Sequence, residues 1–301
     1  MSWRPTLPSD DDVLERVLDA QTRDLGGGFT VGRVLPAALR RTVGPFVFFD
    51  HMGPHRLVVG EGMDVRPHPH INLATVTYLF SGAIHHRDTL GSSLDIRPGA
   101  INWMTAGRGI AHSERTPPEL RQTGSEAHGL QLWVGLPSAS EEVEPAFDHY
   151  PSESLPELTD RDVRVRVLAG HAFGATSPVR TLSPLFYLDV ELGQGATLPL
   201  PDEGYHDRAL YLVSGAVQVG GERATPRHML VFKAGSTPTI VAREPSRFVV
   251  LGGEPLDGPR HLWWNFVSSS KDRIEQAKAD WQAGRFGTIA GDEREFIPLP
   301  V

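Results

Sequence analysis

Two short histidine-containing segments have the spacing of a metal site. Pro67-His68-Pro69-His70 places two imidazoles at positions i and i+2, and Ala111-His112-Ser113-Glu114 repeats this spacing with a carboxylate. Residues i and i+2 of an extended strand point to the same face, so each pair can reach one ion. With 13 histidines among 301 residues, roughly half an His-x-His is expected by chance. The histidine pair alone is therefore only a hypothesis.

The composition limits which ion such a site would hold. The chain has no cysteine, which excludes disulfides, thiol nucleophiles, iron–sulfur clusters and thiolate zinc sites. Any metal must be bound through nitrogen and oxygen. Three neutral imidazoles, from His68, His70 and His112, together with the carboxylate of Glu114 suit Fe(II), Mn(II), Co(II), Ni(II) or Cu(II) and leave coordination positions open.

An internal repeat gives independent support for this site. Residues 77–84 recur as residues 210–217, a shift of 133 positions with five of eight residues identical. A period this long indicates a duplicated domain and not a solenoid. At the same shift Pro201 and Glu203 stand opposite the histidine pair, and no His-x-Glu follows residue 232. The second copy is therefore expected to lack the metal site that the first copy carries.

The pattern along the chain predicts an all-β protein. Short apolar, β-branched and aromatic runs alternate with Gly, Pro and Asp, as in a β-sandwich or barrel. At about 150 residues per domain the length predicts two domains, which we place at residues 1–150 and 160–301, with a linker within 145–159. The expected strands are 47–49, 75–80, 130–134, 186–190, 210–213, 229–232 and 248–251.

Helices are expected in two places. The run Ser268-Ser269-Ser270 offers an N-cap, and Ile274, Ala277 and Trp281 fall on one apolar face of the helix that follows. We expect this C-terminal helix to pack against a barrel and assign it no chemistry. Residues 11–20 also have a weakly helical pattern.

Charge and hydropathy exclude several partners. Twenty-nine basic against 37 acidic residues give a net charge of −8 without a dense Lys/Arg run, so we expect no direct nucleic-acid binding. No run of about 18 apolar residues is present, so we expect no membrane partner. The first residues do not form a secretory signal. A cytoplasmic protein is the default expectation.

Five further motifs are expected to be structural. Asp50-His51 lacks a Gly-x-Ser-x-Gly nucleophile and fits a turn after a strand, and His85-His86 fits a solvated hairpin. The glycines at 26–28 open no helix, so a phosphate loop is not expected. Residues 263–266 (Trp-Trp-Asn-Phe) fit apolar packing beside the C-terminal helix, and His206 is a lone histidine.

Four segments of the chain resemble the pirin family. The run Trp-Met-Thr-Ala-Gly-Arg-Gly-Ile at 103–110 is highly specific, and the likeness covers nearly the whole chain. The resemblance implies a bicupin, in which two cupin β-barrels follow each other and the N-terminal one holds a non-haem metal, usually iron. The segments are 43–54, 67–91, 102–114 and 128–134.

The resemblance assigns the ligand roles to the residues that spacing had already indicated: His68, His70, His112 and Glu114. We therefore expect one divalent metal, with Fe(II) first and Mn, Co, Ni or Cu as alternatives. The C-terminal barrel is expected to have no metal ligands and to end in a helix. One departure concerns residues 71–74, where many pirins read Arg-Gly-Phe-Glu and this chain reads Ile-Asn-Leu-Ala. No ligand is lost, but a charged pair near the pocket is replaced, which affects substrate preference.

The resemblance also implies a function. Several bacterial pirins are associated with quercetin 2,3-dioxygenase activity, in which O₂ cleaves the central ring of a flavonol with loss of CO. Glu114 would then be both a metal ligand and the base that takes the proton of the substrate hydroxyl. The alternative is a non-catalytic metal or redox sensor that regulates a protein partner, as eukaryotic nuclear pirins are thought to act.

Overall fold

The computed structural model describes residues 12–24, 29–200 and 204–300, which form two compact units. The first barrel, as we call the unit with the first copy of the repeat, comprises the described residues of 23–31, 48–152 and 256–300. The second barrel comprises the described residues of 12–22, 32–47 and 153–255. Residues 12–22 thus belong to the second barrel and residues 256–300 to the first.

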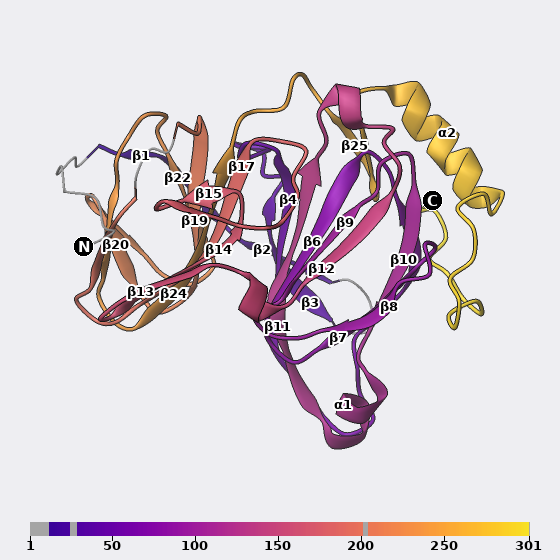
Figure 1. The fold of residues 1–301 in the computed structure, drawn as a ribbon, viewed down its shortest axis with the longest axis horizontal. Helices are drawn as coiled ribbons and strands as arrows, with labels where there is room; N and C mark the ends of the chain where they lie inside the picture. Colours follow the sequence, from indigo (N-terminus) through magenta and orange to yellow (C-terminus); the bar gives the residue numbers. More distant parts are fainter. Residues whose placement is uncertain (1–11, 25–28, 201–203, 301) are drawn as a thin grey trace. The chain divides into compact units, whose positions relative to one another are not determined.

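The first barrel contains most of an antiparallel sheet of seven strands, whose last three strands also include residues assigned to the second barrel, and one sheet of four strands (Figure 1). The seven-stranded sheet has the order β12 (Ala146–Tyr150), β9 (Ile101–Thr105), β6 (Leu73–Ser81), β11 (Ser125–Gly135), β4 (Phe46–Leu57), β3 (Thr30–Leu35) and β2 (Gln21–Asp24). The four-stranded sheet has the order β5 (Asp64–His70), β10 (Ile110–Arg115), β7 (Ile84–Asp88) and β8 (Ser93–Ile96). The helix α1 (Pro118–Thr123) and the 3-10 turn η1 (Ser138–Ser140) lie in connections.

The second barrel repeats this plan with one sheet of seven strands and one of four. The seven-stranded sheet has the order β1 (Leu14–Asp19), β22 (His228–Phe232), β19 (Asp207–Ser214), β24 (Ser246–Gly253), β17 (Leu185–Leu192), β14 (Val163–Ala169) and β13 (Glu157–Asp160). The four-stranded sheet has the order β18 (Thr197–Pro199), β23 (Thr239–Ala242), β20 (Val217–Val219) and β21 (Glu222–Ala224). The short pair β15 (His171–Ala172) and β16 (Ala175–Thr176) and the turn η2 (Ser152–Ser154) complete it. The predicted duplication is therefore visible strand by strand.

The turn inside the repeat explains why its glycine recurs. Gly82 and Gly215 have φ values of 80° and 83°. A Cβ on Gly82 would lie 2.2 Å from the Glu126 carbonyl oxygen, and one on Gly215 would lie 2.4 Å from that of Pro245. Both the left-handed backbone and the close approach of the neighbouring strand require glycine at this position.

The seven predicted strands are confirmed, and all lie within longer strands of the two large sheets. One other expectation was wrong. Residues 14–19 form β1 and not a helix, because they pair along their length with β22. The boundary between the two units, at residues 152 and 153, lies within the expected linker at 145–159, which also contains β12, paired with β9 at the edge of the other large sheet. β1 and β12 thus occupy equivalent edges of the two large sheets. β1 precedes the other strands of its sheet in the sequence, whereas β12 follows the other strands of its sheet.

The C-terminal helix is confirmed. α2 (Lys271–Gln282) begins at Ser270, whose hydroxyl accepts a hydrogen bond from the Arg273 amide. It packs on the first barrel through Ile274 and Ala277, next to Ile71 and the hairpin of β25 (His261–Trp263) and β26 (Phe266–Ser268). Among the described residues, no helix is both long and apolar enough to cross a membrane.

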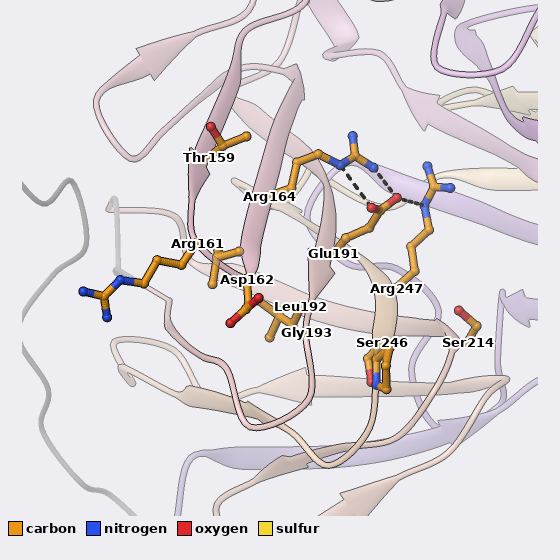
Figure 2. A pocket seen from close by; sticks show the side chains of 12 residues that line it. Thr159, Arg161, Asp162, Arg164, Glu191, Leu192, Gly193, Ser214, Ser246 and Arg247 are labelled. Atoms are coloured by element: carbon orange, nitrogen blue, oxygen red, sulfur yellow. Dashed lines mark hydrogen bonds and ion pairs between the residues drawn. The ribbon is translucent and has the colours of Figure 1, made fainter.

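The interior of the second barrel is an apolar core. Leucine, valine, isoleucine and phenylalanine side chains from both of its sheets fill it, among them Leu210, Ile240 and Val250. Outside this core, Arg164 donates to Glu191 (3.1 Å) and Arg247 to Asp189 (2.9 and 2.6 Å). Arg164, Glu191 and Arg247 border an open cavity of about 580 Å³ and lie close together (Figure 2). These ion pairs link β14, β17 and β24.

Candidate metal centre

The predicted site residues lie on two neighbouring strands of the four-stranded sheet in the first barrel. The register of β5 and β10 pairs His68 with His112, and His70 follows two residues further along β5. β5 is an edge strand, which tolerates Pro67 and Pro69 because one side of it forms no ladder bonds. The two-residue spacing therefore brings the three imidazoles to one face of the sheet.

The three imidazoles form a compact group of ligand atoms. One ring nitrogen from each of His68, His70 and His112 lies within 4.8 Å of the other two, and all three side chains are buried. The Nε2 atoms of His70 and His112 are 3.1 Å apart. Two nitrogens that each lie about 2.1 Å from one ion, about 90° to 110° apart, are separated by about 3.0 to 3.4 Å. The geometry of the pair fits a shared ion.

In His68 and His70, a hydrogen bond at Nδ1 determines that Nε2 is the nitrogen available to the imidazole group. Nδ1 of His68 donates to the Arg66 carbonyl at 2.9 Å, and Nδ1 of His70 donates to the Asn265 carbonyl at 3.1 Å. A carbonyl oxygen only accepts, so each Nδ1 carries the proton and each Nε2 keeps its lone pair. Nδ1 of His112 is buried without a partner in the described part of the chain. The lone pairs of these ring nitrogens suit a cation.

Burial also keeps the imidazoles in the form that binds metals. It lowers the pKa of His68 to about 4. Burial, with repulsion from His68 adding to it, holds the pKa values of His70 and His112 well below their usual range. All three rings are therefore neutral near neutral pH, and neutral imidazole is the ligand form.

Glu114 is buried beside this group on β10. Its register partner on β7 is His86, and it faces the same side as His112 two residues earlier. Oε1 of Glu114 accepts a hydrogen bond of 3.2 Å from the Thr77 hydroxyl. Burial raises the pKa of Glu114, while the charge of His86 and this hydrogen bond oppose the effect. The group with mutual distances below 4.8 Å contains the three imidazoles without Glu114, so its role as a ligand stays a prediction.

His86 was wrongly assigned to a solvated hairpin. His85 does face outward and binds Asp95 at 2.6 Å, but His86 is buried, and its Nε2 donates to Asp88 at 3.0 Å. Its ring lies 5.3 Å from that of His112, centroid to centroid. The signal was present in the sequence, because His86 and Asp88 have the same i, i+2 spacing as the predicted ligands.

Aromatic rings surround the imidazole group. Trp133 of β11 lies edge-on to His70 with centroids 5.2 Å apart and stacks on Phe48 at 4.0 Å. Phe147 of β12 stacks on His86 at 4.2 Å. Trp133 and Phe147 thus place apolar rings directly against His70 and His86.

The remaining candidate residues lie elsewhere. Asp50 and His51 are buried inside β4, so their expected position in a turn was wrong, and His51 Nε2 lies 2.8 Å from His128 Nε2. His206 binds Asp207 through Nδ1 at 2.9 Å. The residues at 263–266 pack beside α2 as predicted. The glycines at 26–28 and the pair Pro201 and Glu203 lie outside the described residues.

Two barrels related by an internal repeat, one with a buried histidine group and one with an apolar core, define a bicupin with a single candidate metal site among the described residues. Comparison with known families agrees with this class. Residues 28–134 match the Pirin family, and residues 187–287 match the Pirin C-terminal cupin domain. The chain belongs to the pirin family.

Individual relatives match along nearly the full length. A pirin-like protein of Caulobacter vibrioides is 52% identical over 96% of this chain and 100% of its own. Human pirin is 34% identical over 87% of this chain and 89% of its own. The crystal structure of a quercetin 2,3-dioxygenase from Acinetobacter baumannii is 34% identical, covers 95% of both chains and has a TM-score of 0.87.

Proposed function

We propose that this protein is a metal-dependent dioxygenase of the quercetin 2,3-dioxygenase type, which cleaves a flavonol with O₂. The observation that carries the proposal is the buried group of three neutral imidazoles, with two Nε2 atoms 3.1 Å apart and two Nδ1 protons bound by carbonyls. The similarity to the Acinetobacter baumannii quercetin 2,3-dioxygenase supports the substrate class.

In this proposal His68, His70 and His112 hold the metal, and Glu114 completes the set from β10. We propose Fe(II) as the native ion, with Mn, Co, Ni and Cu as alternatives that suit the same donors. When bound, the ion supplies Lewis acidity and open coordination positions. We place the protein in the cytoplasm, as the sequence predicts.

The chain's own residues bind the substrate and take its proton. A planar flavonol would bind beside the imidazole group, where Trp133 and Phe147 supply aromatic neighbours. Glu114 is the base, since it is a buried carboxylate at this group and burial raises its pKa toward the range in which a base works.

Anaerobic reconstitution with Fe(II), followed by a panel of flavonols, tests the proposal through O₂ uptake and CO release. We expect uptake and CO in equal amounts with at least one flavonol, and neither in His68→Ala or His112→Ala, which should also lose the metal. Full turnover in a metal-free variant would refute the proposal. Stoichiometric iron without O₂ uptake across the panel, together with redox-dependent binding of a protein, would instead support a non-catalytic sensor.

A further inference from the structure

Thr77, which is bonded to Gln131, reaches Glu114 from the opposite sheet of the first barrel. Thr77 of β6 and Gln131 of β11 are register partners. Oγ1 of Thr77 lies 2.9 Å from Oε1 of Gln131 and 3.2 Å from Oε1 of Glu114. Thr77 is buried. One hydroxyl thus connects the large sheet to the carboxylate beside the imidazole group.

The single proton of the Thr77 hydroxyl determines which group donates in each of the two hydrogen bonds. A hydroxyl has one proton, so Thr77 cannot donate to two oxygens at once. The oxygen and nitrogen of a glutamine amide are alike in shape, and turning the amide over places its NH₂ group against Thr77. Gln131 then donates to Thr77, and Thr77 donates to Glu114. A carboxylate is a better acceptor than a neutral amide oxygen, which favours this direction.

The second barrel shows what stands at these positions where the histidine group is missing. The shift of 133 places Leu210 at the position of Thr77. Leu210 pairs with Val250 on the neighbouring strand, as Thr77 pairs with Gln131. Both replacements belong to the apolar core of the second barrel.

Glu114 has an equivalent too. The shift relates His86 to Val219, and Val219 pairs with Ile240 as His86 pairs with Glu114. Ile240 also lies in the apolar core. All three polar positions of the first barrel are therefore apolar in the second, which indicates that the three polar residues serve one purpose together.

We propose that Thr77, oriented by Gln131, is a positioning residue that fixes the Glu114 carboxylate with only Oε2 facing the imidazole group. Glu114 then acts on an ion or a substrate hydroxyl through one oxygen. Threonine suits this role because its β-branched side chain is stiff about χ1. This inference rests on the proposed metal site.

The test compares Thr77→Val, which keeps the shape and removes the hydroxyl, with Thr77→Ser, which keeps the hydroxyl. Thr75→Val is the matched control, because Thr75 is a buried threonine two residues earlier on the same face of β6. Each variant is crystallised metal-free, then loaded with Co(II), whose visible spectrum reports its coordination. Gln131→Met serves as a second variant should Thr77→Val fail to fold.

We expect Thr77→Val to displace the Glu114 carboxylate, to change the Co(II) spectrum and to weaken Co(II) binding about tenfold, as the loss of other outer-sphere partners does. Gln131→Met should have a smaller effect of the same kind, whereas Thr77→Ser and Thr75→Val should match the wild type. An unmoved Glu114 with an unchanged spectrum and affinity overturns the inference. If the wild-type protein binds no Co(II), the proposed function fails, and the metal-free crystals still decide whether Thr77 positions Glu114.

Discussion

The buried imidazoles make the stability of the metal-free protein depend on pH. The folded-state pKa values of His68, His70 and His112 lie below the unfolded value of 6.5, so the unfolded chain binds more protons as the pH falls. Their contribution is complete above about pH 6.5 and is lost as the pH falls below it, down to about pH 4 for His68. For His68 alone the drop from 6.5 to about 4 corresponds to about 3 kcal/mol at most.

Urea unfolding of chelator-treated protein across this pH range measures the effect. We expect the free energy of unfolding to decrease as the pH is lowered, and to decrease less steeply in His68→Ala. Thr75→Val is the control, since it alters a buried side chain without removing a titratable group, and it should leave the slope unchanged. Equal slopes for the wild type and His68→Ala would contradict this account.

The same residues show how far sequence reasoning reaches into the site. His68, His70 and His112 could be predicted because strand alternation is a local rule that needs no knowledge of the fold. The partners that prepare them could not. Asn265 meets His70 across 195 positions of sequence, and Thr77 meets Glu114 from another sheet. Such contacts depend on register and barrel closure, which no local pattern specifies.

At the scale of elements, the turn between β7 and β8 holds His86 in place through Asp88. Oδ1 of Asp88 accepts hydrogen bonds from the amides of Leu90 (2.9 Å) and Ser92 (3.0 Å), while Oδ2 binds His86. Asp88→Ala would leave these donors without their acceptor inside the protein. We expect a loss of about 2 to 4 kcal/mol in urea unfolding.

Two further variants serve as controls for Asp88→Ala. Asp88→Asn should lose less, because its amide oxygen can still accept from the two turn amides. Asp95→Ala should cost less than about 1 kcal/mol, since its bonds to His85 and Arg97 are partly exposed. An Asp88→Ala protein as stable as the wild type would show that the turn does not depend on this carboxylate.

Element type was predictable where a segment is buried on both faces or has a clear cap. The central strands and α2 meet these conditions, and both were predicted correctly. β1 and β12 do not, because they are edge strands with half-exposed, mixed patterns. Their conformation follows from pairing with β22 and β9, so local propensity indicated a helix in one case and a linker in the other.

At the scale of the whole molecule, each barrel contains a segment from the opposite end of the sequence. β1 completes the large sheet of the second barrel by pairing with β22. The C-terminal segment instead joins the first barrel, where the Ile297 amide donates to the Pro67 carbonyl at 2.8 Å and Arg115 binds Asp292 through two bonds of 2.7 Å. The second barrel therefore depends on an N-terminal strand, and the first barrel depends on the C-terminal segment.

Two truncations test this arrangement by hydrogen exchange with mass spectrometry. Removal of residues 1–19 should raise exchange in β22, because that strand loses its hydrogen-bonded neighbour, and should leave β5 protected with metal binding intact. Removal of residues 286–301 should raise exchange in β5 and weaken metal binding, because the segment bonded to Pro67, next to His68, is lost. The reverse pattern, with β5 exposed by the N-terminal truncation and β22 by the C-terminal one, would mean that each end supports its own half.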